Sequence, residues 1–301
     1  MRTSIQATPS LVRAPAVPPA AGLAAALAAA VLAAGCTGGL GKRSVVPIEG
    51  GLALPAGAQK LRIELEHGRV EVRPGPDGEV RFRGAVRRAA DTVEQLGQFE
   101  ARGTDLKLSP DPAEKDVWVL TGPTRPPELD VKIGLLAVEL ALELPPKLPL
   151  QVRIKGSGGL VVEDRAAATD VSTKRGDVRV TRCTGATRVA TSYGTVIVYD
   201  HRGDLDVETG IGEMQVFVRE PGTRLRLVNG AGNIQCYLPA TAGFHADARV
   251  ETGKIANGFG LPIEHPSTYS ATMVGRRGDE RTEIVLRTGT GHLSLSHKSF
   301  D

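Results

Sequence analysis

Aromatic residues are scarce in this chain of 301 residues, which holds 11 of them: one Trp, four Tyr and six Phe. Aliphatic side chains must therefore form any core. With 41% hydrophobic and 24% charged residues the chain can bury such a core, which excludes a disordered protein. Glycine and proline are plentiful, at 36 and 20 residues, and this composition favours many short strands over long helices.

An excess of charge of one sign is also lacking. The 37 Lys and Arg residues against 34 Asp and Glu give a net charge of +3. Arg2 and Arg13 lie in a leader that we expect to be removed, which leaves 35 basic residues against 34 acidic ones, or +1. Because binding to a phosphate backbone needs a larger positive excess, we expect no nucleic-acid partner.

The sequence has no apolar run long enough to span a bilayer. Residues 21–34 form an uncharged run of 14 residues, mostly Ala and Leu, which suits the apolar region of a secretory signal. This run ends in Leu32-Ala33-Ala34-Gly35-Cys36, which resembles the lipobox of bacterial lipoproteins, although that pattern prefers Leu at the place of Ala33.

The resemblance implies that Cys36 is acylated and becomes the first mature residue, so that the membrane is one partner of the chain. We expect a lipoprotein signal peptide at 1–35 and a tether at 36–44. The expected location is the bacterial cell envelope, lipid-anchored at the outer membrane or the periplasmic face. The alternative is an ordinary cleaved signal with a cysteine near the cleavage site.

A glycine-centred motif recurs in the second half of the chain. It stands at Gly158, Gly176, Gly194, Gly212, Gly232, Gly253 and Gly291. The first three spacings are 18 residues and the next two are 20 and 21, and apolar residues follow most of these glycines two and four places on. A fixed period of this size predicts stacked coils, because one strand-turn-strand unit needs neighbours to bury its apolar face.

Alternation assigns one side of each strand to the core. The inward columns are Leu160/Val178/Val196/Met214/Ile234, Val162/Val180/Val198/Val216/Cys236 and Val171/Val189/Val207/Leu227, the last flanked by Thr173/Thr191/Thr209/Asn229. An outward column, Asp170/Arg188/Asp206/Arg226, alternates in charge, as cross-strand pairing would favour. Cys183 and Cys236 lie three coils apart, about 14 Å, so we predict that they are unpaired.

The remaining segments lack the period. Residues 45–149 read as irregular β-strands, with a helix expected over Ala89 to Phe99, and residues 258–301 as a loop with closing strands. The predicted class is all-β: a parallel β-solenoid, of β-helix or β-roll type with about 18 residues per coil, over 150–257. An irregular β-sheet capping region at 45–149 precedes it.

The combination of an irregular β start, the segment Leu140 to Pro145 and the stacked Thr-x-x-Gly-x-Val-x-Val coils resembles the bacterial "putative adhesin" domain family of unknown function. The resemblance covers roughly residues 45–297. Its motifs are structural, so it implies a fold and no catalytic residues. Members of that family are often lipoproteins or membrane-tethered, which agrees with Cys36.

Catalytic and metal-binding patterns are weak. Asp177, Arg179 and Glu213 lie outward on one face, and Asp204, Asp206 and Glu208 on the other, but scattered surface acids explain them best. The turns lack the repeated Asp of a calcium roll, and the six histidines lack zinc-site spacing. We therefore expect no enzyme, no cofactor and no metal ion.

The function that we predict is a non-enzymatic, adhesin-like protein that presents a repetitive surface for binding or scaffolding, with an envelope glycan or protein as partner. The alternatives are a carbohydrate-active β-helix enzyme that acts on envelope polysaccharide and a self-assembling envelope element. One outward column, Tyr199, Phe217 and Tyr237, gathers three aromatic residues and is the candidate partner-binding strip. In the alternative interpretation the rings have a structural role, in which they stack on one another or cover the end of the core.

Overall fold

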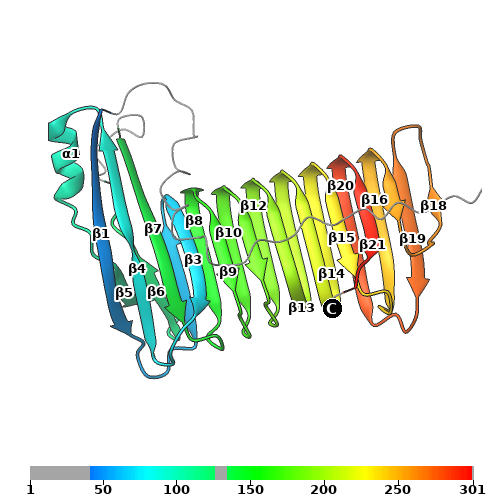
Figure 1. Ribbon diagram of the computed structural model, residues 1–301, viewed down its shortest axis with the longest axis horizontal. Helices are drawn as coiled ribbons and strands as arrows, with labels where there is room; N and C mark the ends of the chain where they lie inside the picture. The colour runs from blue at the N-terminus through cyan, green and yellow to red at the C-terminus, as the bar shows by residue number, and fades with distance from the viewer. Residues whose placement is uncertain (1–40, 126–133, 300–301) are drawn as a thin grey trace, which may run out of the picture. The chain divides into compact units, whose positions relative to one another are not determined.

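Strands form almost all of the regular structure in the computed structural model, which describes residues 41–125 and 134–299 (Figure 1). These residues belong to one unit of the chain, 40–301. Within them, 21 strands join in a single sheet, so the predicted all-β class is confirmed. The expected signal peptide and Cys36 lie outside the described residues.

One row of neighbouring strands is parallel from end to end. In spatial order it contains β6 (Val117–Thr121), β2 (Lys60–Leu65), β8 (Leu150–Ser157), β10 (Thr169–Arg175), β12 (Thr187–Tyr193), β13 (Val196–Ile211), β14 (Met214–Ala231), β20 (Thr282–Thr290) and β16 (Phe244–Thr252). The strands stand side by side across Figure 1. Asp170 pairs with Arg188, and Arg188 with Asp206, which is the 18-residue register expected from the glycine motif.

A second parallel row follows the glycines. It contains β7 (Gly134–Leu144), β3 (Gly68–Pro74), β9 (Leu160–Glu163), β11 (Val178–Thr181), the first parts of β13 and β14, then β15 (Ile234–Leu238), β21 (Leu293–His297) and β17 (Ile255–Asn257). Because β13 and β14 are long, each contributes to both rows. We call one strand of each row together a coil.

The inward columns are confirmed as the core. Their aliphatic side chains are at most 1% exposed, Val198 and Val207 among them. Beside the core, the motif glycines stack closely: a Cβ added to Gly176, whose φ is +145°, would lie 2.1 Å from the carbonyl oxygen of Gly158. The buried hydroxyl of Thr173 donates to that same carbonyl over 3.0 Å. Glycine therefore keeps this corner narrow, and Thr173 pairs the Gly158 carbonyl, whereas the buried hydroxyl of Thr209 in the same column has no hydrogen-bond partner among the described residues.

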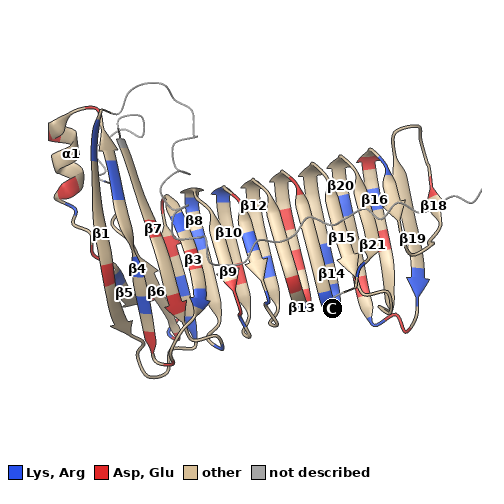
Figure 2. Cartoon of the chain, viewed as in Figure 1, with Lys and Arg blue, Asp and Glu red and all other residues tan. Residues whose placement is uncertain are grey.

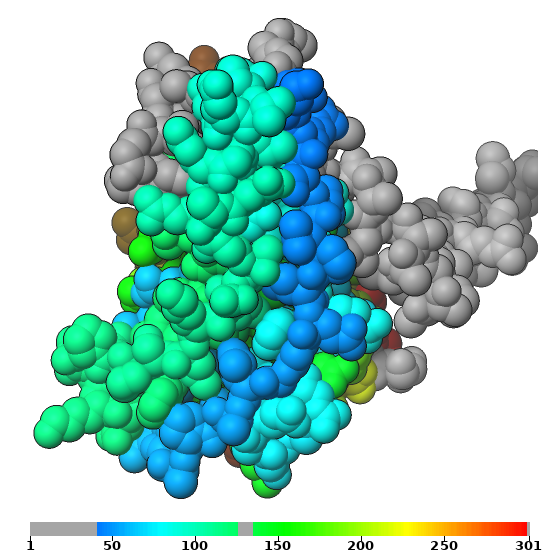
Figure 3. All heavy atoms as spheres, turned by 90° about the vertical axis from the view of Figure 1, so that its left-hand side faces the viewer, coloured from blue at the N-terminus to red at the C-terminus, as the bar shows by residue number. Residues whose placement is uncertain are grey.

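The sheet as a whole is mixed, because antiparallel strands close both ends of the parallel rows. At one end lie β1 (Lys42–Ala53), β4 (Glu79–Ala90) and β5 (Lys107–Pro110), and at the other β18 (Ile263–Glu264) and β19 (Ala271–Arg277). Figure 3 looks onto the first end, which β1 (blue) covers together with β4 and the helix. Strand β1 begins at Lys42, within the range predicted as a tether.

Coil order departs from sequence order near both ends. Strands β2 and β3 lie between β6/β7 and β8/β9, although β6 and β7 follow them in the chain. Likewise β20 and β21 lie between β14/β15 and β16/β17. Gly291 therefore lies between Gly232 and Gly253, although it follows both in the sequence.

The one helix among the described residues, α1 (Val93–Glu100), starts later than predicted. Residues Ala89 and Ala90 end β4 instead of opening the helix. Thr92 is the N-cap: its hydroxyl accepts from the Gln95 backbone N–H at 3.2 Å, and the Gln95 side chain accepts from the Thr92 N–H at 3.1 Å. This capping box fixes the boundary. The helix packs against β4 and β1, and its Phe99 is 1% exposed and belongs to the buried core.

Candidate binding surfaces

The aromatic column forms a stack of rings. Tyr199 and Phe217 meet edge to face with centroids 5.4 Å apart, and Phe217 and Tyr237 stack in parallel at 4.6 Å. The three residues come from β13, β14 and β15, which bring them together through parallel pairing. The predicted proximity is therefore confirmed.

The column is less exposed than alternation implied. Phe217 is 8% exposed, whereas Tyr199 is 43% exposed. The Lys298 ammonium lies 4.2 Å from the Phe217 ring centroid, and the Lys298 backbone N–H donates to the Leu238 carbonyl at 2.8 Å. The segment after β21 thus crosses the column and covers its middle ring. The three rings therefore do not form a continuous exposed platform. They contact one another and Lys298 instead.

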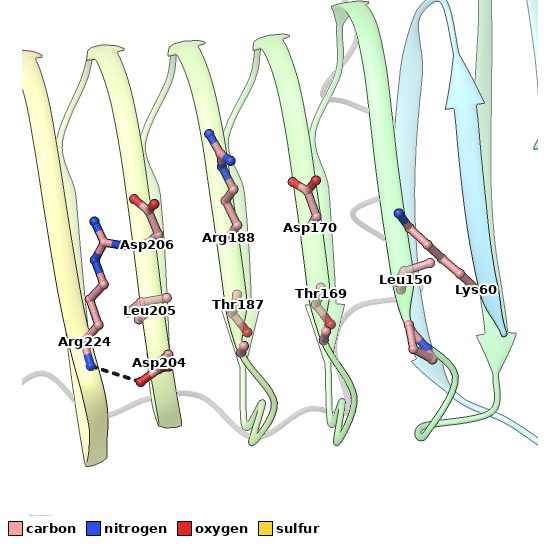
Figure 4. A pocket seen from close by; sticks show the side chains of 13 residues that line it. Lys60, Leu150, Thr169, Asp170, Thr187, Arg188, Asp204, Leu205, Asp206 and Arg224 are labelled. Carbon is pink, nitrogen blue, oxygen red and sulfur yellow. Dashed lines mark hydrogen bonds between the residues drawn. The ribbon is translucent and has the colours of Figure 1, made fainter. Parts of the chain in front are cut away.

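A shallow groove of about 470 Å³ crosses the starts of neighbouring strands in the first parallel row. Figure 4 shows its side chains along β2, β8, β10, β12, β13 and β14. The floor consists of small or apolar residues, Pro149, Ala168 and Ala186 with the edges of Leu150 and Leu205. Because alanine occupies the outward position just before β10 and β12, the surface is hollow there.

Threonine completes the floor without leaving a polar group unpaired. Thr169 and Thr187 lie at the inward position next to the alanines and are 2% and 3% exposed. Each hydroxyl donates to the carbonyl two residues earlier, at 3.2 Å in Thr169 and 3.1 Å in Thr187. These short-range bonds hold the turns that lead into β10 and β12, so the floor is fixed by local sequence.

The charged column, of which Asp170, Arg188 and Asp206 line the groove, is confirmed in register but only partly in pairing. Arg226 donates to the Asp206 carboxylate at 2.7 Å, as alternation predicts. Asp170 instead accepts from the Gln151 side-chain amide at 2.7 Å. Arg188, which stands between the two aspartates and is exposed, forms no ion pair or hydrogen bond through its side chain with any described residue.

Asp204, at the far end of the groove, is held by the next coil. Its carboxylate accepts from the backbone N–H groups of Arg224 at 3.0 Å and Thr223 at 2.7 Å (Figure 4). These bonds, that of Arg224 first, hold the pKa of the Asp204 carboxyl below its usual value. The exposed guanidinium of Arg224 forms no ion pair or hydrogen bond within the described part of the chain, and neither does the Lys60 ammonium.

The acids considered for catalysis also have partners on neighbouring coils. Asp177 accepts from the Thr195 N–H at 2.8 Å, and Glu213 accepts from the Asn233 amide at 3.3 Å. The Arg226 guanidinium donates to the Glu208 carboxylate at 3.3 Å as well as to that of Asp206. Figure 2 shows that basic and acidic residues are interspersed along the strands. These contacts favour a role for the acids in joining the coils.

Sequence reasoning missed a buried polar column at one corner of the coils. Arg165, Cys183 and His201 lie 18 residues apart and are at most 1% exposed. Arg165 donates to the Pro145 carbonyl at 2.7 Å and to that of Leu148, and burial lowers its pKa to about 10. The signal was present in the repeat, because these positions share the period of the glycines.

Cys183 and Cys236 are free and buried, so the prediction that they are unpaired is confirmed. Among residues 41–125 and 134–299, no three His, Cys, Asp or Glu side chains gather closely enough to hold a metal ion. No helix within that part of the chain has the length and apolar character to cross a membrane.

Comparison with known proteins does not identify a family for this chain. No family model matches the chain, and no curated protein matches it. Among solved structures, the chain is similar to a "putative cell adhesion protein" from Clostridium sporogenes. That similarity covers 84% of this chain and 100% of the other, with a TM-score of 0.38 and 14% sequence identity. A similarity this distant carries no argument about function.

Proposed function

We propose that this protein is a non-enzymatic, lipid-anchored component of the bacterial cell envelope that presents a β-solenoid surface for binding or scaffolding. The observation that carries the proposal is the groove, whose residues come from neighbouring coils in matching register. The solenoid description is supported by the parallel rows and their 18-residue period. The anchor is supported by the sequence around Cys36.

The adhesin-like role is favoured over the glycan-cleaving enzyme by the partners of the outward acids. A general acid or nucleophile must be free to meet its substrate. Asp177, Asp204 and Glu213 instead accept hydrogen bonds from the next coil. Such carboxylates suit a rigid surface better than proton transfer.

Two experiments test this function. Cell fractionation with a labelled fatty acid should find the full chain labelled and in the membrane fraction, and a Cys36→Ala variant should lose both the label and the membrane association. The purified full chain in detergent should sediment with isolated envelope material. A folded wild-type chain that is unlabelled, or that stays in the supernatant, contradicts the proposal. Shortening of envelope glycans by the purified chain would favour the enzyme instead.

A further inference from the structure

We propose that the groove binds a linear acidic polysaccharide whose carboxylates are widely spaced along the chain. This inference rests on the proposed binding function and names its ligand class. The groove runs across the strands, so an occupant must follow the stacking direction over several coils. An extended polymer fits this path, whereas a compact small molecule would fill only part of it.

The available positive charge points to an anionic ligand. Lys60, Arg188 and Arg224 line the groove, and their side chains form no ion pair or hydrogen bond with any described residue. A free guanidinium offers a planar set of donors that matches a carboxylate. Within the described part of the chain, no side-chain hydrogen bond or ion pair competes with a ligand for these three cations.

The three carboxylates of the groove, by contrast, already have donors. Asp170 accepts from Gln151, Asp206 from Arg226, and Asp204 from backbone N–H groups. Each carboxylate still has lone pairs for a further donor. A sugar hydroxyl can supply that donor, and the apolar floor over Ala168 and Ala186 can cover the C–H face of a sugar ring. Carboxylates, free cations and an apolar floor together match an acidic glycan.

The distances between the cations of the groove distinguish this ligand from a densely charged one. Strands β2 and β12 are three neighbours apart, so Lys60 and Arg188 stand about 14 Å apart along the row, and Arg188 and Arg224 about 10 Å apart. A nucleic acid carries a charge every few ångströms and would meet the three aspartates between these cations. The groove also lacks aromatic side chains for base stacking.

The test uses the full chain in detergent and a fluorescent hyaluronan octasaccharide, which carries one carboxylate per disaccharide. Its carboxyl methyl ester is the uncharged control ligand. We expect saturable, salt-sensitive binding of the acid, a loss of about tenfold in affinity for Arg188→Ala, and a larger loss for Arg188→Ala combined with Arg224→Ala. Arg179→Ala is the matched control, because Arg179 is an exposed arginine without a partner in the described chain but lies outside the groove. It should change affinity less than about twofold.

Several results would overturn the inference: no binding of the octasaccharide by the folded wild type, equal binding of the methyl ester, equal losses for Arg188→Ala and Arg179→Ala, or tighter competition by single-stranded DNA or by anionic vesicles. Thermal unfolding of each variant checks that it is folded. Because the substituted side chains are exposed, we expect every variant to fold. If envelope sedimentation persists while octasaccharide binding fails, the ligand class is wrong and the binding function stands. If both fail, the proposed function falls as well.

Discussion

His201 is a titratable side chain in a place where charge is costly. It is 0% exposed, its Nε2 lies 3.1 Å from the Asp204 carbonyl, and its Nδ1 has no hydrogen-bond partner among the described residues. Burial lowers its pKa. Arg165 and Cys183 precede it in the same corner column, and the nearby Asp204, which favours an imidazolium, does not offset the effect of burial on the pKa.

This environment predicts that acid destabilises the fold. The unfolded chain takes up a proton at His201 as the pH falls below about 6.5, while the folded chain does not, so the free energy of unfolding falls by up to about 1.4 kcal/mol per pH unit until the lowered pKa is reached. In a His201→Val variant, chosen to match Val218 at the same position of the next coil, this loss should be absent.

Denaturant unfolding of both proteins between pH 7.5 and 5 measures the difference. His67, whose pKa burial also lowers, is retained in both proteins and cancels in the comparison. Parallel pH profiles for the two proteins would contradict the assignment.

The cysteine thiols should be inert in the folded protein. Both are 0% exposed, and burial raises the pKa of Cys183 and raises that of Cys236 to about 12. Because the thiolate is the reactive form, iodoacetamide at pH 8 should modify neither residue until the chain is denatured, and then both without reductant. Mass spectrometry of the two peptides reads this out. Modification of Cys236 in the folded chain would disprove its inward position.

At the scale of the strand, β13 offers two neighbouring positions with opposite environments. Val198 is 0% exposed in the core, whereas Ile197 lies on the outer face between Arg179 and Gln215. An unpaired carboxylate in the core is heavily penalised. We expect Val198→Asp to cost roughly 4 kcal/mol or more in the free energy of unfolding, and Ile197→Asp less than about 1 kcal/mol. Similar melting losses for the two variants would show that the faces are assigned wrongly.

Alternation and the glycine period were enough to predict the inward columns from Leu160 to Cys236, because those positions are buried in every coil. Pairing between side chains was harder to predict. Asp170 has Arg188 opposite it on one side and Gln151 on the other, and it bonds to Gln151, so the register alone does not decide which donor the carboxylate meets. The groove was not predicted, because a hollow depends on what small side chains such as Ala168 leave empty.

The ends of the stack escaped prediction for a topological reason. Local sequence indicates that Gly68 and Gly291 open motif strands, yet it does not say which strands lie beside them. Which strands pair across a long stretch of sequence depends on their shape and on which strand edges have open hydrogen-bonding groups. The glycine period fails at Asn257, so it gives no information about these pairings.

The last coil in sequence is central to the stability of the whole unit. Strand β20 pairs with both β14 and β16, and β21 with both β15 and β17. Their inward residues, including Leu286 and Leu295, are 0% exposed. Removal of residues 282–301 should abolish cooperative thermal unfolding, because it opens the core between two coils. Removal of residues 299–301 alone, which lie after β21, should change the melting temperature little. A truncated chain that melts as cooperatively as the full chain would contradict this account.

The position of β20 and β21 between earlier strands also determines when the protein can finish folding. A chain made from its N-terminus completes β16 before β20 exists, and at that moment the edge of β14 is open to either strand. Native stacking therefore requires β20 to lie between two strands that are made before it. Until β20 and β21 have been made, the chain holds an unfinished edge, so the stack can be completed only after residues 282–297 have been synthesised.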